Sequence, residues 1–393
     1  LKHTLLFVVL STLIACTTSV SVDTSISMGS DLAMVSPEAV GMDSERLNRV
    51  TAAMENLVDE GLLAGAVTIA ARDNKVMHFE SVGYRDLESR ALMTNDTLFR
   101  IYSMSKPVTG VALMALYEEG KFKLSDPVEM YIPQMKDLQV YTGTNADGSM
   151  TTEDANHKMT IRELMSHTGG LSYGIFSQST VDSAYLAAGI GAAAAAGILA
   201  PNETGRDFVR KLGQIPLKSQ PGSQWEYSVS VDVQGYLVEV LSGQKFGEFL
   251  EERIFTPLNM EDTAFYVPEE KLSRFSQMYT YSEGGALAPS ELFPGADFTK
   301  APAFESGGAG LVSTAADYMR FSQMLLNGGE LDGERILAPL TVELMHRDQT
   351  PKAMAESALD QQGTAFGLDF AVILDPVEAE SYSKGEYYWG GAA

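Results

Sequence analysis

Near the start of the globular part of the chain, the apolar residues show first a helical spacing and then two short strand-like runs. Between Leu47 and Val58 the apolar residues have helical spacing, and Ser44 precedes them as a candidate N-terminal cap. Two apolar runs follow at 66–71 and 76–82, separated by a short polar stretch. The pattern predicts a helix and then a β-hairpin.

The pattern changes to helical segments in the middle of the chain and returns to strands near its end. A second helix is expected after Ser103 and as far as Gly120, whose glycine suits a helix terminus. Helical segments broken by glycine and proline follow. Strand-like runs reappear at 310–313 and 366–374, and residues 387–389 look extended.

This order of elements predicts an α/β (α+β) fold. Strands near both ends with helices between them imply an antiparallel sheet built from both chain ends and flanked by helices. We expect this α/β lobe to comprise about 41–102 and 300–393. Residues 103–299 would form an inserted, mostly helical lobe.

The first residues resemble an export signal. A cationic start, a short apolar run and small residues over positions 1–15 are typical of a secretory signal peptide, and the run is too short to span a membrane. Leu13-Ile14-Ala15-Cys16 resembles a bacterial lipobox, in which the cysteine is lipidated. An ordinary signal that contains a cysteine is the alternative. We therefore expect a lipoprotein of the bacterial cell envelope, facing the periplasm, with residues 16–40 as a flexible tether.

Charge and cysteine content narrow the possible partners. The 28 basic and 52 acidic residues give a net charge of −24, which opposes binding to nucleic acid and, without a covalent anchor, to anionic lipid. A single cysteine excludes an internal disulfide and a cysteine-rich zinc site. The histidines lack metal-binding spacing, so neither a metal nor another cofactor is expected. The sequence leaves the oligomeric state open.

The strongest chemical signal is Ser103-Met104-Ser105-Lys106 at the start of the second helix. Residues three apart share one helix face, so the Lys106 amine can approach the Ser103 hydroxyl. A serine hydroxyl is a weak nucleophile unless a neighbour accepts its proton. Ser105, followed three residues later by Val108, has no such neighbour.

Two further motifs are weak by themselves. Tyr227 lies in a turn just before a predicted helix, from which its phenol can point into a cleft and exchange a proton with Ser103. Near the end of the chain, Trp389-Gly390-Gly391 would let a substrate approach backbone N–H groups closely.

In this order the three motifs resemble the serine β-lactamase and penicillin-binding-protein family, closest to its family VIII carboxylesterases and class C β-lactamases. The resemblance covers nearly all of 41–393 and includes the loop segments Leu164–Leu171 and Ser306–Leu311.

The resemblance implies a role for each motif. Ser103 would be the acylated nucleophile, Lys106 its activator and Tyr227 the base. The backbone N–H groups of Ser103 and Ala392 would form the oxyanion hole. His167 is expected to be a structural loop residue, because lysine and tyrosine chemistry needs no histidine.

Departures from the β-lactamase pattern indicate the substrate. Where those enzymes have Tyr-x-Asn, this chain has Tyr227-Ser228-Val229, and Trp389-Gly390-Gly391 replaces Lys-Thr-Gly. Tryptophan cannot bind a substrate carboxylate by charge but offers apolar area. We therefore expect Trp389, Gly390 and Gly391 to contact the substrate of a carboxylesterase that acts on small uncharged acyl esters.

Three expectations stay open at this stage. A β-lactamase or D-alanyl-D-alanine peptidase of the same fold is one alternative, and a non-catalytic envelope binding lipoprotein is another. Members of the family continue with further strands beyond the Gly-Gly, so the resemblance also implies a domain truncated after Ala393. A protein ending there is expected to be unstable or weakly active.

Overall fold

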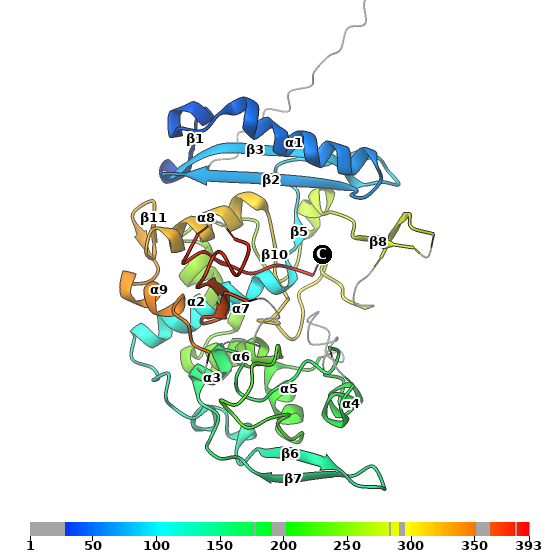
Figure 1. Ribbon diagram of the computed structural model, residues 1–393, viewed down its shortest axis with the longest axis vertical. Helices are drawn as coiled ribbons and strands as arrows, with labels where there is room; N and C mark the ends of the chain where they lie inside the picture. The colour runs from blue at the N-terminus through cyan, green and yellow to red at the C-terminus, as the bar shows by residue number, and fades with distance from the viewer. Residues whose placement is uncertain are drawn as a thin grey trace, which may run out of the picture.

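The computed structural model describes residues 28–176, 178–190, 202–282, 284–290, 295–350, 362–381 and 383–392 (Figure 1). The expected signal peptide and Cys16 lie outside the described residues. The expected tether ends before residue 40, because Leu32 is fully buried and β1 (Ala33–Met34) pairs in parallel with a strand of the first sheet. Burial of Leu32 explains this difference from the expectation.

The first sheet has the order β1-β3-β2, with β4 (Ala91–Leu92) also on β3. The predicted hairpin is present as β2 (Gly65–Arg72) and β3 (Lys75–Asp86), paired antiparallel. Helix α1 (Ser44–Asp59) covers one face of the sheet, and Figure 1 shows both as a layer above the other helices. The cap of α1 is Asp43 rather than Ser44: its carboxylate accepts the Arg46 N–H at 2.8 Å.

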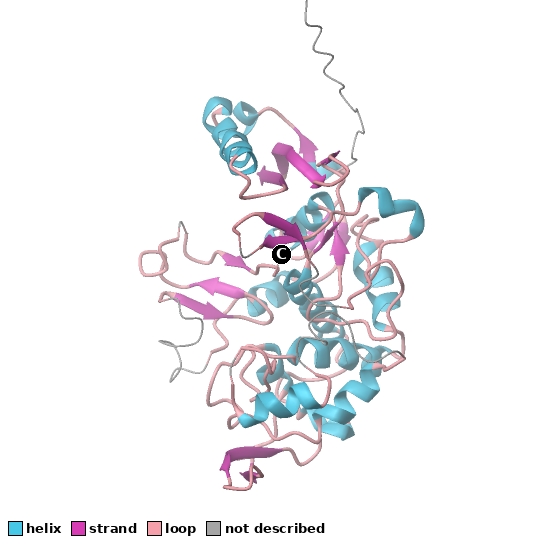
Figure 2. Ribbon diagram, turned by 90° about the vertical axis from the view of Figure 1, so that its right-hand side faces the viewer, coloured by secondary structure: helices cyan, strands magenta, loops and turns pink. Residues whose placement is uncertain are grey.

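The centre of the molecule is helical. Helix α2 (Ser105–Glu118) packs against α6 (Ser230–Ser242), and both are largely buried. Other helices surround α6 or lie nearby: α3 (Ile161–Met165), α4 (Thr180–Ala187), α5 (Gly205–Leu212), α7 (Phe246–Leu250), α8 (Ala315–Leu326) and α9 (Pro339–Met345). Figure 2 shows these helices below the first sheet.

Shorter helical turns connect these elements. A π-helical segment, Glu251–Phe255, extends α7. The 3₁₀ turns are Ser30–Leu32, Pro37–Val40, Tyr102–Met104, Val128–Met130, Pro133–Met135 and Glu269–Arg274.

Several short strands pair into small sheets separate from the first sheet. Short β5 (Phe99–Arg100) pairs with β10 (Val312–Ser313) and so joins distant parts of the chain. The expected strand at 366–374 is instead a hairpin of β13 (Thr364–Phe366) and β14 (Ala371–Ile373). Its turn contains Asp369 at φ +71°, a conformation that interrupts a strand.

Among the described residues, the two chain-end segments pair through β5 and β10, whereas the first sheet holds no strand from 300–393. β15 (Tyr387–Tyr388) pairs with β14 and completes a three-stranded sheet separate from the first. Three further hairpins were not predicted: β6–β7 (Gln139–Thr144, Met150–Asp154), β8–β9 (Tyr279–Tyr281, Leu287–Pro289) and β11–β12 (Glu330–Leu331, Glu334–Arg335). Among the helices that the structure describes, none has the length and apolarity to cross a bilayer.

Candidate active site

Ser103 lies in a tight turn immediately before α2. The turn is the 3₁₀ segment Tyr102–Met104, and the α-helix itself begins at Ser105. The buried Tyr102 has φ +41°, an uncommon conformation for a residue with a side chain. Packing thus holds a strained residue next to the serine, as often happens where geometry serves a site.

The Lys106 ammonium is fully buried and meets Ser103 directly. Its Nζ donates to Ser103 Oγ at 3.0 Å and to the Gly308 carbonyl oxygen at 2.8 Å. The same nitrogen lies 4.7 Å from the ring centroid of Tyr227 and 5.4 Å from that of Tyr173, within cation–π range. The spacing predicted from one helical turn is therefore realised.

Tyr227 contacts the same Ser103 hydroxyl. It precedes α6, and its hydroxyl donates to Ser103 Oγ at 2.8 Å. Its ring is held by Trp225, stacked at 6.0 Å between centroids, and by Tyr173 at 5.0 Å. Ser103 and Lys106 therefore share one hydrogen-bonded centre with Tyr227, which lies 124 positions after the serine.

The Trp-Gly-Gly segment lies beside this centre. The Trp389 ring contacts Tyr227 at 5.4 Å and Phe366 at 5.2 Å between centroids. A Cβ added to Gly391 would lie 2.7 Å from the Ile101 carbonyl oxygen, so only glycine allows this close approach. Ala392 follows directly and is exposed.

His167 lies next to Tyr227 but does not contact Ser103. Its Nδ1 accepts the Ser228 N–H at 3.3 Å, and its ring is 5.1 Å from the Tyr227 ring. Burial, with a smaller contribution from the charge of Lys106, holds the pKa of His167 well below its usual range. A neutral, packed imidazole agrees with the expected structural role.

Sequence reasoning missed two buried carboxyl groups near Lys106. Asp232, on α6, and Asp369, in the β13–β14 turn, are both fully buried. Burial raises the pKa of Asp232 to about 6 and that of Asp369 well above its usual range, although Lys106 lowers both. The sequence signal was an acidic residue among the apolar positions of a helix start, as in Val231-Asp232-Val233.

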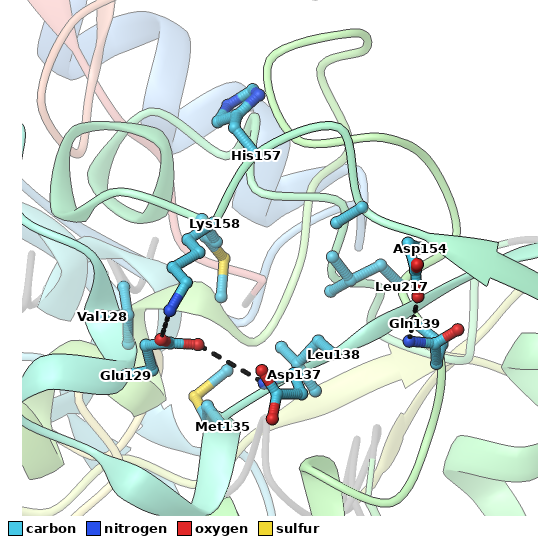
Figure 3. A pocket seen from close by; sticks show the side chains of 12 residues that line it. Val128, Glu129, Met135, Asp137, Leu138, Gln139, Asp154, His157, Lys158 and Leu217 are labelled. Atoms are coloured by element: carbon cyan, nitrogen blue, oxygen red, sulfur yellow. Dashed lines mark hydrogen bonds and ion pairs between the residues drawn. The ribbon is translucent and has the colours of Figure 1, made fainter.

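A cavity of about 450 Å³ lies between two 3₁₀ turns and the β6–β7 hairpin (Figure 3). Lys158 and Glu129 form an ion pair across it, and the Asp137 N–H donates to Glu129. Its polar groups are thus paired with one another. The part of the chain that the structure describes contains no group of three or more histidine, cysteine, aspartate or glutamate residues suited to a metal ion.

Comparison with known proteins agrees with the family suggested by the motifs. The profile of the family described as "Beta-lactamase" matches residues 50–392. Protein Rv1367c of Mycobacterium tuberculosis is 34% identical over 351 residues, which cover 87% of this chain and 84% of the relative. Esterase EstB of Burkholderia gladioli is 30% identical over 390 residues, covering 91% and 88%.

The fold has a close counterpart among solved structures. EstCE1, described as a hydrolase with promiscuous acyltransferase activity, superposes with a TM-score of 0.73 at 28% identity. The match covers 88% of each chain. The predicted α/β fold of the β-lactamase and transpeptidase type is thus confirmed.

Proposed function

The chain belongs to the beta-lactamase family and has the fold of its serine hydrolases, and from this premise we propose that it is a carboxylesterase acting on small uncharged acyl esters. One observation carries the proposal. Ser103 Oγ lies 3.0 Å from Lys106 Nζ and 2.8 Å from the Tyr227 hydroxyl, so two groups able to exchange a proton with serine both contact its hydroxyl.

In the proposed acylation step, Ser103 Oγ attacks the ester carbonyl carbon while its proton passes to Tyr227 in its phenolate form. Lys106 stabilises that phenolate and the developing negative charge by its position. The tetrahedral intermediate collapses when the alkoxide leaves and takes the proton from Tyr227. The products are the alcohol and an acyl group on Ser103.

Deacylation repeats these steps with water as the nucleophile. Tyr227 accepts a proton from water, hydroxide adds to the acyl carbonyl, and Ser103 Oγ leaves with the proton returned. We assign stabilisation of the oxyanion in both steps to the backbone N–H groups of Ser103 and Ala392, as the motif resemblance implies.

The aromatic surroundings favour an uncharged substrate. Trp389, at the position where the β-lactamase pattern has a lysine, lies against Tyr227 and against Phe366. Aromatic rings offer apolar contact area to an acyl or alcohol group and no positive charge. The relatives named esterases support the same substrate class.

Hydrolysis of short p-nitrophenyl esters tests the proposal. We expect turnover by the native sequence and its loss in Ser103→Ala, whereas Ser105→Ala keeps the nucleophile and serves as the matched serine control. Full activity of Ser103→Ala would refute the assignment. Faster turnover of nitrocefin than of any ester would instead favour the β-lactamase or peptidase alternative.

A fluorophosphonate probe separates an enzyme from a binding protein of the same fold. We expect one covalent label at Ser103, identified by mass spectrometry of the labelled peptide. A folded protein that remains unlabelled would support the non-catalytic envelope lipoprotein.

We further propose that the protein is anchored to the bacterial envelope membrane, facing the periplasm, through a lipid on Cys16. The Leu-Ile-Ala-Cys pattern supports this proposal. Two or more acyl chains are needed for stable anchoring of an acidic protein. Incorporation of labelled palmitate, lost in Cys16→Ser, is the expected result; equal incorporation in that variant would contradict it.

A further inference from the structure

The Ser306–Gly308 segment links a buried carboxylate to the lysine of the proposed site. Asp232 Oδ1 accepts the Ser306 hydroxyl at 2.5 Å and the Gly308 N–H at 3.2 Å. The carbonyl of the same Gly308 accepts Lys106 Nζ at 2.8 Å. Gly308 therefore links Asp232 to the Lys106 ammonium through one hydrogen bond on each side of the residue.

Close packing leaves this segment little freedom. A Cβ on Gly307 would lie 2.5 Å from the Val231 carbonyl oxygen. A Cβ on Gly308 would lie 2.8 Å from Asp232 Oδ2 and 3.1 Å from the Tyr173 hydroxyl. The two glycines thus allow the segment to lie directly on α6, which accounts for the Ser-Gly-Gly motif that the proposed mechanism does not use.

Charge adds a second connection. Lys106 is buried without solvent, and a buried ammonium is costly unless a negative group compensates it. The charge of Lys106 acts on Asp232, and Asp232 Oδ2 has no hydrogen-bond partner among the described residues. Titratable groups near this pair are Tyr173, Tyr227 and, on other sides of Lys106, His167 and Asp369.

We propose that Asp232 is a positioning residue: through Gly308 and through its charge it holds the Lys106 ammonium against Ser103. It does not touch the reacting atoms. The inference rests on the proposed function, because it assigns Lys106 the task of activating Ser103.

Two substitutions separate the effect of the Asp232 charge from that of its hydrogen bonds to the Ser306–Gly308 segment. Asp232→Asn keeps an oxygen for Ser306 and Gly308 but removes the negative charge, whereas Ser306→Ala removes one hydrogen bond and keeps the charge. Asp317→Asn is the matched control. It removes another buried carboxyl, in the first turn of α8, whose hydrogen bonds come from the Asp262 N–H at 2.8 Å and the Thr263 hydroxyl at 2.9 Å.

The main measurement is the second-order rate of fluorophosphonate labelling of Ser103, together with kcat and KM for an ester per labelled site. For Asp232→Asn we expect labelling and kcat to fall on the order of tenfold to a hundredfold, part of the 10²–10⁴ that positioned proton transfer supplies. KM should stay within about threefold, a bound that such a purely kinetic effect implies. Ser306→Ala should lose less, and Asp317→Asn should keep its labelling rate.

The pH profile distinguishes positioning from a merely structural role. In the native protein the labelling rate should fall below about pH 6, where Asp232 takes up a proton, and this acid limb should be absent in Asp232→Asn. Ser306→Ala should keep the native profile. An Asp232→Asn rate per site within twofold of native, or equal losses and unchanged profiles in both variants, would overturn the inference.

If the variants do not fold, the pH dependence of Ser103 labelling in the native protein still tests the inference. Protonation of Asp232 removes the same charge, so the labelling rate should fall as the pH drops below about 6 while circular dichroism stays constant. A flat profile from pH 7 to 5 would overturn the inference. Absence of any labelling or ester turnover by the native protein would instead refute the proposed function.

Discussion

His167 and Tyr227 pack ring against ring, with centroids 5.1 Å apart, and only the tyrosine reaches Ser103. The imidazole is buried at φ +56° and accepts a backbone N–H at Nδ1. A histidine beside a reactive serine suggests a catalytic triad. This contact instead makes His167 part of the wall that orients the phenol.

The buried neutral imidazole should make stability depend on pH. Because the pKa of His167 is lowered in the fold, the unfolded chain binds a proton first as the pH falls below about 6.5. Native stability should then fall relative to His167→Asn, by at most about 1.4 kcal/mol per pH unit. Urea unfolding of both proteins at pH 7, 6 and 5 measures this difference. A difference that does not change with pH would contradict a neutral His167.

Tyr227→Phe removes one hydroxyl and keeps the ring that packs against Trp225 and Trp389. We expect kcat/KM for esters to fall by about 10²–10⁴, the range for a positioned acid or base, with little change in thermal stability. Steady-state kinetics and a melting curve test both parts. Tyr281→Phe is the control, because that exposed phenol donates only to the Leu62 carbonyl. A loss below threefold in Tyr227→Phe would show that the phenol carries no proton.

Trp389→Lys places a cation where the β-lactamase pattern has one. The half-buried ring lies 5.4 Å from Tyr227, so a lysine there lies beside the proposed site. We expect the ratio of nitrocefin to p-nitrophenyl butyrate turnover to rise by about tenfold, as one added charge interaction of about 1.4 kcal/mol implies. The gain should shrink in high salt. Trp389→Leu, which adds no charge, should not raise the ratio; an equal rise in both variants would contradict a role for charge.

Asp317, in the first turn of α8, offers a second test of buried charge. Burial raises its pKa to about 6, although its carboxylate accepts the Asp262 N–H and the Thr263 hydroxyl. Between about pH 6 and 4 the Asp317 carboxyl is therefore protonated in the folded protein but ionised in the unfolded chain. Native stability should rise relative to Asp317→Asn as the pH falls through this window, by roughly 2–3 kcal/mol.

Chemical denaturation at pH 7 and pH 4 measures this change. Asp147→Asn, on the exposed β6–β7 turn, removes a carboxylate whose pKa is lowered by the Ser149 hydroxyl and should shift stability in the opposite direction. A gap between native protein and Asp317→Asn that stays constant with pH would refute the prediction.

Local patterns in the sequence predicted the elements that depend on local chemistry. The β2–β3 hairpin follows from two apolar runs around Asp73-Asn74, residues that tolerate the positive φ found there. The distance between Ser103 and Lys106 follows from the geometry of one helical turn. The contact of Tyr227 with Ser103 could be predicted only from the family resemblance, because no local rule relates a tyrosine to a serine 124 positions earlier.

Features of the fold and site that depend on long-range contacts could not be predicted from the sequence. Residues 366–374 form a strand-like run in the sequence, but the chain turns at Asp369, whose φ is +71° and whose buried carboxyl accepts a hydrogen bond from Gln234. Asp232 looked like an ordinary acidic residue of a first helical turn until its partners Ser306 and Gly308 were known. Burial of a carboxyl depends on tertiary packing, and hydrophobic periodicity carries no signal for it.

Helix α2 is buried at every position from Ser105 to Leu116. It therefore has no solvent-facing stripe along which it could detach by itself, and its amide protons should exchange only through opening of the whole domain. Loss of fluorophosphonate labelling at Ser103 on heating should coincide with cooperative unfolding instead of preceding it. The proposed nucleophile thus directly precedes a helix that is among the last parts of the fold to open.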